Sequence, residues 1–332
     1  MTRSKKKKFA SRAVLLICAL LIMPLLAQPT AQRPKILGIS HAAYFVSDLP
    51  KALDFWHGLL GYDEPYDLKK PDGTIGTAFI KINDHQHIEL VNSQPPAGAG
   101  RLNHIAFTVD NIEQMRRYLI SRGVDVSSGI IKAKTGDLGF KIKDPDGNVV
   151  EFVEPQPDSM EASNAGKFVP ATRISDAIYH LGFLVGASQK SIQFYGDLLG
   201  FREFWRGSSS GTVLSWIDML VPDGEDYVEF MLYSDLPAPD KRGGQEHVSL
   251  VVPDVAKSIS ILESRPAFKA YAKPLAPHTG VNGQRQVNLF DPDGTRIELM
   301  EPTTASGKPV PPSTAPPPRL RKKRGLKNRA GF

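Results

Sequence analysis

The sequence predicts an α+β fold in which four βαβββ modules pair into two half-barrel domains. A histidine is followed by a glutamate 47–51 residues later, and this spacing occurs four times along the 332-residue chain. The segments around the first and third histidines resemble each other, as do those around the second and fourth, so the order is A-B-A-B. Repetition at this interval indicates one supersecondary unit copied along the chain. The histidines are His41, His104, His180 and His247, and the glutamates are Glu89, Glu151, Glu229 and Glu298.

Residues 1–32 have the pattern of a secretory signal peptide. Lys5 to Lys8 and Arg12 precede an apolar run from Ala13 to Ala27, and small and polar residues follow around Ala31. The run is shorter than the roughly 20 residues that span a bilayer. We therefore expect export to the periplasm or the outside of the cell, with an uncleaved membrane anchor as the alternative. The single cysteine, Cys18, lies inside the run, so the mature protein would have no disulfide or thiol chemistry.

Residues 302–332 are rich in Pro, Ser, Thr and basic side chains, which predicts a disordered tail. The formal charge of +6 depends on the two ends of the chain. Residues 1–32 hold six Lys or Arg and the tail holds eight, without any acid; subtracting these 14 from 41 leaves 27 basic against 35 acidic residues. The acidic folded part disfavours nucleic acid as a partner, whereas the tail could contact anionic surfaces by charge alone.

The first module begins with a strand over Ser40–Val46, where apolar residues alternate, and continues with helical spacing over Leu49–Leu60. Three further strands end with His87–Val91. The third module repeats this order, since "HLGFLVGASQKSIQFYGDLLGF" from His180 matches "HAAYFVSDLPKALDFWHGLLGY" from His41. Both helices end in Leu-Leu-Gly, where the glycine is expected to supply a left-handed cap.

The second and fourth modules share "HIAFTVDNIEQMRRYLISRG" and "HVSLVVPDVAKSISILESRP", and each later contains Asp-Pro-Asp-Gly four residues before its glutamate. Proline and glycine there predict a tight turn into the last strand, at Asp144–Gly147 and Asp291–Gly294. The modules thus group into a first domain over residues 36–156 and a second over 173–301. Residues 157–172, polar and without a clear period, are expected to link them.

Strand alternation predicts where the histidines and glutamates point. Ile105, Phe107 and Val109 form one face of their strand, so His104 lies on the other. The same parity places Glu151 away from the helix, and the fourth module repeats the arrangement. Two such sheets side by side would curl this face into a cleft, and both His–Glu pairs of a domain would converge inside it.

Five segments resemble the vicinal oxygen chelate superfamily, which includes glyoxalase I, extradiol dioxygenases and fosfomycin- and bleomycin-resistance proteins. They are "FWHGLLGY", "FYGDLLGF", "NHIAFTVD", "KDPDGNVVEF" and "FDPDGTRIEL", and the resemblance covers about residues 36–301. It implies βαβββ modules that pair into a U-shaped cleft around one divalent ion. The implied metal ligands are His41, Glu89, His104 and Glu151 in the first half and His180, Glu229, His247 and Glu298 in the second.

Imidazole and carboxylate ligands suit Zn²⁺, Ni²⁺, Co²⁺, Mn²⁺ or Fe²⁺, and no thiolate is present to select a softer ion. Such an ion binds two adjacent substrate oxygens and stabilises a developing enediolate or peroxide. A carboxylate that leaves the metal can act as a base, and the resemblance makes Glu151 and Glu298 the candidate catalytic bases. The alternative is that these residues bind no metal: each histidine would be a structural strand residue and each glutamate would be solvated.

Four ligands per half favour a glyoxalase-I-like lyase or isomerase acting on a small 2-hydroxycarbonyl substrate, although export argues against the usual glutathione adduct. The alternative is a ring-cleaving dioxygenase with iron on His180, His247 and Glu298. Glu229 and Asn288 stand where those enzymes tend to have a histidine and a tyrosine, which weakens it. A third possibility is a non-catalytic, resistance-type protein that binds a small molecule. The substrate and the oligomeric state stay open.

The remaining histidines are assigned no ligand role by the sequence. His85 and His87, beside Glu89, are expected at the surface or as outer partners of the ligands. His57, on the first helix, is expected to be exposed. His278 is expected to be an ordinary loop residue, although it could line the second cleft.

Overall fold

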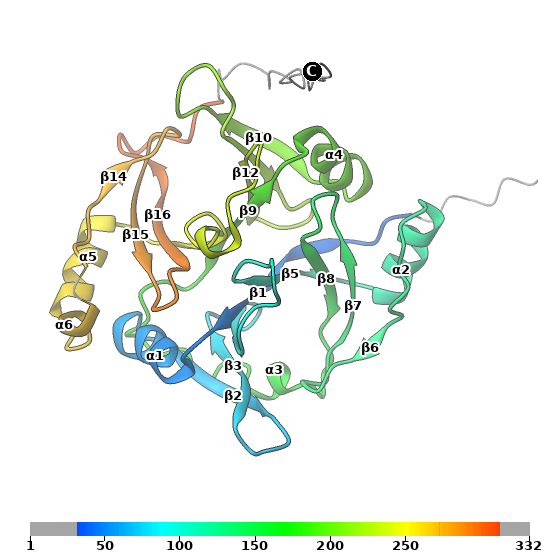
Figure 1. Cartoon of the computed structure of the whole chain (residues 1–332), viewed down its shortest axis with the longest axis horizontal. Helices are drawn as coiled ribbons and strands as arrows, with labels where there is room; N and C mark the ends of the chain where they lie inside the picture. Colours follow the sequence, from blue (N-terminus) through cyan, green and yellow to red (C-terminus); the bar gives the residue numbers. More distant parts are fainter. Residues whose placement is uncertain (1–31, 272, 313–332) are drawn as a thin grey trace, which may run out of the picture. The chain divides into compact units, whose positions relative to one another are not determined.

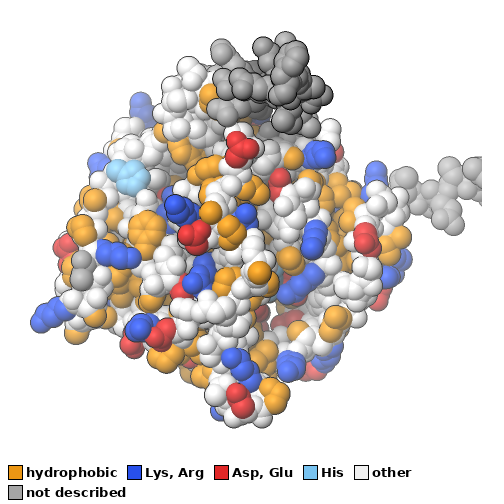
Figure 2. All heavy atoms as spheres, viewed as in Figure 1, with side chains coloured by type: hydrophobic (Ala, Val, Ile, Leu, Met, Phe, Trp, Pro, Cys, Tyr) orange, Lys and Arg blue, Asp and Glu red, His pale blue; other side chains and the backbone are white. Residues whose placement is uncertain are grey.

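The computed structural model describes residues 32–271 and 273–312, which form two eight-stranded sheets (Figure 1). The predicted signal peptide, apart from its last residue, and most of the predicted tail lie outside the described residues. Within the described part, no helix is long and apolar enough to cross a membrane. Basic, acidic and hydrophobic side chains are interspersed on the face shown in Figure 2.

The first sheet has the strand order β2-β3-β4-β1-β5-β8-β7-β6. Its first module consists of β1 (Ile36–Val46), α1 (Leu49–Leu53) continuing as the π-helical turn η1 (Asp54–Leu59), β2 (Asp63–Lys69), β3 (Ile75–Lys81) and β4 (His87–Asn92). Its second module consists of β5 (Leu102–Val109), α2 (Ile112–Ser121), β6 (Ile131–Lys132), β7 (Leu138–Lys143) and β8 (Val149–Glu154). Each module is therefore βαβββ, as the sequence predicts.

The second sheet repeats that order as β10-β11-β12-β9-β13-β16-β15-β14. Its third module consists of β9 (Ile178–Val185), α4 (Ser188–Ile192), η2 (Gln193–Leu198), β10 (Arg202–Gly207), β11 (Trp216–Leu220) and β12 (Tyr227–Leu232). Its fourth module consists of β13 (His247–Val251), α5 (Val255–Ser264), α6 (Phe268–Tyr271), β14 (His278–Thr279), β15 (Gln284–Phe290) and β16 (Arg296–Thr304). The short helix η3 (Pro239–Lys241) connects the two modules. The prediction of four modules in two half-barrel domains is confirmed.

The first helix spans residues 49–59, close to the predicted Leu49–Leu60, and the first helix of each domain ends just before the predicted glycine. The Asp48 side chain accepts a hydrogen bond from the Lys51 backbone N–H at the start of α1. At the other end, Gly61 and Gly200 adopt φ values of 79° and 83°, which confirms the left-handed caps. The apolar face of each sheet packs under these helices, and Ile105, Phe107 and their alternating neighbours belong to the buried core. Each such side chain contributes about 1.5–3 kcal/mol by leaving water.

The two Asp-Pro-Asp-Gly turns connect the domains reciprocally. Asp146 accepts hydrogen bonds from the backbone of Gly186 and Ala187, both at 3.0 Å, ahead of α4, which has no side-chain cap of its own. Asp293 accepts from the Ser47 backbone at 2.8 Å, ahead of α1. Each domain thus supplies a carboxylate to the start of the other domain's first helix, where the helix dipole favours negative charge.

The segment predicted as a linker is folded over the first domain. It forms α3 (Met160–Ser163), whose first turn is capped by Ser159. Strand β16 continues to Thr304, so the first three residues of the predicted tail, residues 302–304, are part of the second sheet.

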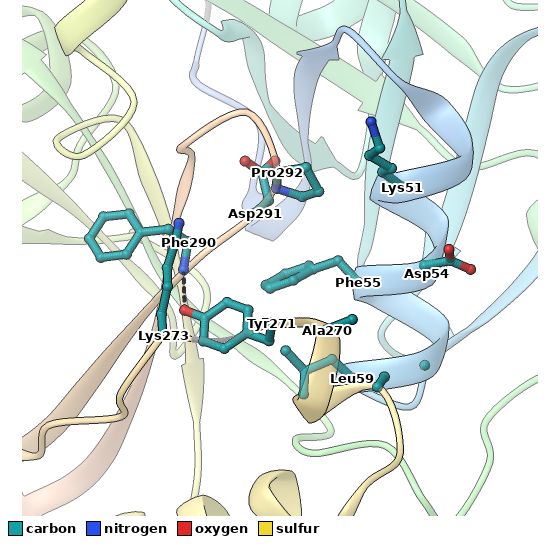
Figure 3. A pocket seen from close by; sticks show the side chains of 12 residues that line it. Lys51, Asp54, Phe55, Leu59, Ala270, Tyr271, Lys273, Phe290, Asp291 and Pro292 are labelled. Atoms are coloured by element: carbon teal, nitrogen blue, oxygen red, sulfur yellow. Dashed lines mark hydrogen bonds between the residues drawn. The ribbon is translucent and has the colours of Figure 1, made fainter.

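A groove of about 640 Å³ lies between α1, η1 and α6 (Figure 3). Phe55, Leu59 and Tyr271 form its apolar floor, and Lys51 and Asp54 belong to its wall. None of its lining residues is a histidine or one of the four glutamates of the repeat. The groove is therefore separate from the sites that follow.

Candidate metal centres

The four central strands of the first sheet each contribute one ligand-type residue. Strand pairing sets them in two rows, with a small residue between the two members of each row. The rows are Glu89 (β4)–Ala43 (β1)–His104 (β5) and His41 (β1)–Ala106 (β5)–Glu151 (β8). Because the rows lie two residues apart along β1 and β5, both point to the same face of the sheet. The small residues leave space between the four side chains.

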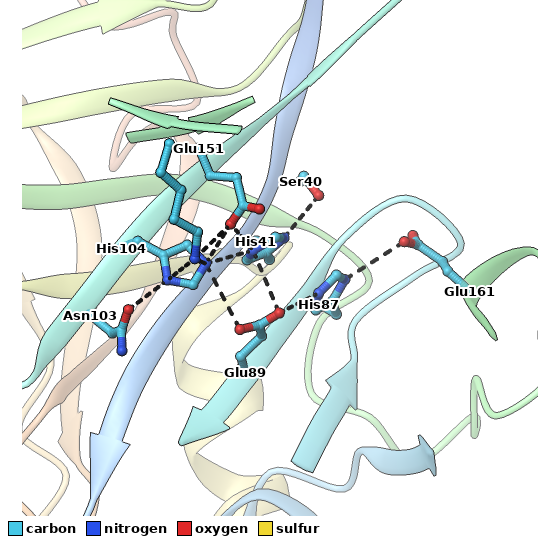
Figure 4. A network of polar contacts seen from close by, with 9 residues as sticks. Ser40, His41, His87, Glu89, Asn103, His104, Glu151 and Glu161 are labelled. Carbon is cyan, nitrogen blue, oxygen red and sulfur yellow. Dashed lines mark hydrogen bonds and ion pairs between the residues drawn. The ribbon is translucent and has the colours of Figure 1, made fainter. Parts of the chain in front are cut away.

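The four side chains meet at one point (Figure 4). The Nε2 atoms of His41 and His104 are 3.0 Å apart. His104 Nε2 is 2.9 Å from Glu151 Oε2, and His41 Nε2 is 3.6 Å from the nearest oxygen of each glutamate. Donor atoms about 2.1 Å from one ion in a tetrahedral site are about 3.4 Å from each other. His41, His104 and Glu151 are thus close to the spacing that a bound divalent ion requires, and Glu89 lies slightly farther out, 3.8 Å from His104 Nε2.

The outward nitrogens of both histidines have oxygen partners. His41 Nδ1 is 3.0 Å from Ser40 Oγ, and His104 Nδ1 is 2.8 Å from Asn103 Oδ1. Metal-binding histidines usually donate their second N–H to an oxygen, which fixes the ring and its tautomer. Both rings are therefore positioned to present Nε2 to an ion.

The electrostatics of the cluster favour a cation. Burial, opposed by the charge of Glu89, lowers the pKa of His41 to about 4. Burial alone would raise the pKa of Glu89, but the neighbouring imidazoles outweigh it and hold that pKa at about 2. The hydrogen bonds and charges of His104 and His41 likewise outweigh burial and depress the pKa of Glu151. At neutral pH the site combines a neutral His41 with two carboxylates, which is the protonation state that metal binding needs.

Sequence reasoning missed Lys141. This residue pairs with Glu151 across β7 and β8, and its Nζ lies 3.1 Å from Glu151 Oε2 and 3.4 Å from His104 Nε2. The side chain is 44% exposed, so the ammonium lies at the solvent side of the cluster. Its ammonium is a cationic partner for the Glu151 carboxylate, in addition to the contact that Glu151 makes with His104.

Two further residues reach the first cluster. His87 is 8% exposed and stacks on His41 with 4.5 Å between ring centroids, so the expectation of a surface position is wrong and that of an outer partner fits. Its register beside His41, and its place two residues before Glu89, could have revealed this. Glu161, from α3, lies 3.9 Å from His87 Nδ1. No period or motif pointed to Glu161, because its segment folds back from between the domains.

The second sheet brings together the other four predicted ligands in the same two rows. The rows are Glu229 (β12)–Gly182 (β9)–His247 (β13) and His180 (β9)–Ser249 (β13)–Glu298 (β16). His180 Nε2 is 3.0 Å from His247 Nε2 and 3.4 Å from Glu298 Oε2, and His247 Nε2 is 3.4 Å from Glu229 Oε2. Both halves therefore assemble the predicted residue sets.

The second cluster differs in its neighbours. Arg296 Nη2 lies 2.6 and 2.9 Å from the two ring nitrogens of His247, so the guanidinium lies against that ring and places a fixed positive charge beside the cluster. Asn288 holds the position beside Glu298 that Lys141 holds beside Glu151. His180 and His247 are both 0% exposed.

Burial dominates the ionisation of the second cluster. Burial and the charge of Glu298 raise the pKa of Glu229 to about 8. A third buried carboxylate, Asp218 on β11, also has a raised pKa, because it is enclosed beside Glu229. Burial and the Arg296 charge lower the pKa of His247. This cluster combines neutral imidazoles with carboxyls of raised pKa beside its own guanidinium, and it fits a divalent ion less well than the first cluster does.

The other histidines stay outside both clusters. His57 is half-buried with a pKa lowered chiefly by burial, so the expectation that it is exposed is wrong. His85 is exposed. His278 is exposed on the short strand β14, where Nε2 contacts the side chain of Gln286 at 2.9 Å.

Residues 38–152 and 177–299 match the family model described as the Glyoxalase/Bleomycin resistance protein/Dioxygenase superfamily. The chain belongs to this superfamily. The two matched segments cover the two sheets and contain all eight ligand-type residues.

Proteins similar to this chain include a lyase, a dioxygenase and a glyoxalase. A lactoylglutathione lyase from Schizosaccharomyces pombe is 31% identical over 153 residues, which is 46% of this chain and 42% of that protein, so the match spans less than half of the relative. A variant of homoprotocatechuate 2,3-dioxygenase from Brevibacterium fuscum superposes with a TM-score of 0.62 at 19% identity, covering 86% of this chain and 77% of that one. The Mn(II)-bound glyoxalase from Novosphingobium aromaticivorans gives 0.61 at 17% identity, covering 81% and 83%. At these identities the solved structures show a shared fold.

Proposed function

We propose that the protein is a divalent-metal-dependent lyase or isomerase of the glyoxalase-I type, acting on a small molecule with two adjacent oxygens, and that its active site is the first cleft. The observation that carries this proposal is the convergence of two imidazoles and two carboxylates from four neighbouring strands. The lyase from Schizosaccharomyces pombe supports the same reaction class.

His41, Glu89, His104 and Glu151 would hold the ion. When bound, it would polarise the substrate oxygens and make the adjacent C–H acidic. A cavity of about 50 Å³ reaches His41, Glu89 and Glu151, enough for a few water molecules. The metal identity is open among Zn²⁺, Ni²⁺, Co²⁺, Mn²⁺ and Fe²⁺; the glyoxalase neighbour is named as Mn(II)-bound.

Glu151 is the proposed base. Lys141 lies 3.1 Å from one of its oxygens, so a Glu151 that turns from the ion keeps a cationic partner. Its depressed pKa keeps it ionised at neutral pH, and a Glu151 that moves away from the two imidazoles would become more basic and could take the proton from the substrate carbon. Glu89 lies on the far side of the cluster, beside His87, and is assigned to holding the ion.

The second cleft is a weaker candidate for any of the three alternatives. A dioxygenase on His180, His247 and Glu298 needs open positions for O₂ and a catechol, but the Arg296 guanidinium lies against His247 and Glu229 lies 3.4 Å from His247 Nε2. Glu298 is only 2% exposed, which disfavours it as a catalytic base and the second cleft as a binding site for a small molecule.

Export to the periplasm or the outside of the cell is also part of the proposal, on the pattern of residues 1–32 alone. Cell fractionation of the full chain would test it: recovery of a shortened form in the exported fraction is expected, and full-length protein confined to the cytosol would contradict it.

The reaction class can be tested with metal-loaded protein and a panel of 2-hydroxycarbonyl compounds in D₂O. Nuclear magnetic resonance should detect exchange of the C–H next to the carbonyl, followed by isomerised or cleaved product, without oxygen uptake. Oxygen consumption with a catechol panel, and no exchange, would favour the dioxygenase. Neither activity in protein that retains one ion per chain would contradict both enzyme hypotheses for these substrates and favour a binding protein.

A further inference from the structure

We infer that His87 is a fifth donor to the ion of the first cleft, and that Glu161 from the segment between the domains holds its ring in place. The inference rests on the proposed metal site and deepens it. It assigns a role to a histidine for which neither the repeat nor the four-residue ligand set has a place.

The strand register brings His87 to the cluster. Because β4 runs parallel to β1, His87 lies directly beside His41. It is also two residues before Glu89 and therefore on the same face of β4. Donor atoms of His41, His87 and Glu89 lie within 4.8 Å of one another, as do those of His41, His104 and Glu151. The two groups share His41 and are otherwise separate, so one ion bound by all five donors would draw His87 and Glu89 closer to His104 and Glu151.

The ring of His87 lacks hydrogen-bond partners. Both of its nitrogens are buried, and neither makes a hydrogen bond. An unsatisfied buried donor or acceptor costs about 1–3 kcal/mol. Nε2 faces the cluster, 3.8 Å from Glu89 Oε1 (Figure 4). A cation held by Glu89 would give this nitrogen the partner that it lacks.

Glu161 supplies the other half of the arrangement. Its Oε2 lies 3.9 Å from His87 Nδ1, on the side of the ring away from the cluster. A small movement or one bridging water would complete the contact. Metal-binding histidines usually have a carboxylate or carbonyl on the second nitrogen, which orients the ring and raises its basicity. Helix α3 therefore connects the interdomain segment to the metal site.

The second half has no equivalent of this pair. Tyr227 takes the position of His87, beside His180, at 4.6 Å between ring centroids. Its hydroxyl is directed to the sulfur of Met300 instead of to the cluster. The additional imidazole is thus specific to the cleft that we propose as the active site, and a third nitrogen donor would favour Co²⁺, Ni²⁺ or Zn²⁺ over Mn²⁺.

Calorimetric titration of metal-free protein with Zn²⁺ and with Co²⁺ tests the inference. Glu161→Gln should weaken binding by at most about 10–100-fold, the range typical of losing an outer partner, and His87→Ala, which removes a donor, should weaken it more. His85→Ala is the matched control, because His85 precedes the same strand but is exposed, and it should bind like the unmodified protein. Thermal unfolding of each metal-free variant reports whether it folds.

A second measurement uses the unmodified protein and does not depend on a variant. X-ray absorption of the Co²⁺-loaded protein should show three imidazoles in the coordination shell, and its visible bands should have the low intensity of a five- or six-coordinate ion. Two imidazoles, together with unchanged affinity in His87→Ala, would overturn the inference while leaving the proposed function intact. Absence of metal binding by the unmodified protein would overturn the proposed function itself.

Discussion

The first and second clefts contain the same four residue types at the same strand positions, and in both the two histidine Nε2 atoms are 3.0 Å apart. They differ in what surrounds that set. In the first cleft, Glu89 and Glu151 keep 17% and 15% of their side-chain surface exposed, both histidines are 4% exposed, and the neighbouring cation is the half-exposed Lys141. In the second, Glu229 also keeps 15%, but Glu298 keeps only 3%, both histidines are 0% exposed, and the guanidinium of Arg296 lies against His247. The repeat therefore preserves the ligand set, whereas the surrounding side chains decide whether it can be used.

The two clefts also differ in charge. The carboxylates of the first are ionised at neutral pH, and this negative charge favours a divalent ion. Enclosure of Asp218, Glu229 and Glu298 together raises the pKa of each, and the pKa of Glu229, about 8, keeps that carboxyl mostly protonated at neutral pH. A group of enclosed carboxyls with raised pKa values beside an arginine attracts a divalent ion less strongly than the ionised carboxylates of the first cleft.

The largest expected effect separates the two candidate bases. Glu151→Gln should lower turnover by about 10²–10⁴-fold, because the amide cannot accept the substrate proton. Glu298→Gln, the matched change in the second cleft, should leave turnover within about twofold. Steady-state kinetics of both variants, after confirming their metal content, provide the comparison. Equal losses in the two variants would mean that both clefts are catalytic.

Replacing Arg296 should make the second cleft more like the first. Val149 stands two residues before Glu151, at the place that Arg296 holds before Glu298. The charge of Arg296 lowers the pKa of both His180 and His247, and Arg296→Val removes that charge. We expect a second ion to bind, seen as a rise from one to two ions per chain in elemental analysis. Val149→Ala is the control and should stay at one; a stoichiometry unchanged in Arg296→Val would show that Arg296 is not what excludes the ion.

The pH dependence of stability should have opposite slopes from the two clefts in metal-free protein. The pKa of Glu229 is raised from 4.5 to about 8, so the folded state holds a proton that the unfolded state releases, and stability falls as pH rises between these values. The pKa of His41 is lowered from 6.5 to about 4, so the unfolded state binds the extra proton and stability rises across that interval.

Thermal unfolding from pH 4 to 9 checks both slopes. Glu229→Gln should reduce the decline between pH 4.5 and 8, although Asp218 and Glu298 keep raised pKa values, and raise Tm at pH 8 by about 2–4 °C for each kcal/mol recovered. His41→Gln should reduce the opposing rise between pH 4 and 6.5 and leave stability between pH 6.5 and 8 unchanged. A decline of unchanged size in Glu229→Gln would mean that Glu229 does not hold the extra proton.

The smallest expected effect concerns the reciprocal contacts of Asp146 and Asp293 between the two domains. Asp146→Asn and Asp293→Asn each weaken a carboxylate at the start of the other domain's first helix. Each should cost about 1 kcal/mol, the usual value of a helix cap. Chemical denaturation should give similar losses for the two variants, and metal affinity should not change. A loss confined to one variant would show that the reciprocal contacts are not equivalent.

The sequence predicted the fold and the convergence of the eight ligand-type residues because both follow from local rules. Alternation along β5 and β8 places His104 and Glu151 on one face, and the pairing of β1 with β5 brings His41 and Glu89 beside them. The same parity applies to His87 and Arg296, each two residues before a glutamate of the repeat, so both could have been found.

Other parts of the site were beyond sequence reasoning. Glu161 lies in a segment without a period, and its approach to His87 depends on how the chain passes between the domains. The contacts of Asp146 and Asp293 depend on the docking of two already folded sheets. The difference in enclosure between the clefts results from many side chains acting together, and no motif encodes it.

The most direct test is to locate the ion. Crystals of the Mn²⁺- or Zn²⁺-loaded protein, measured at the absorption edge of the metal, should show one anomalous peak per chain, between His41, Glu89, His104 and Glu151. His41→Ala should lose this peak, and His180→Ala should keep it. A peak among His180, Glu229, His247 and Glu298 in place of the first, or no peak at either cluster, would contradict the assignment of the first cleft as the metal centre.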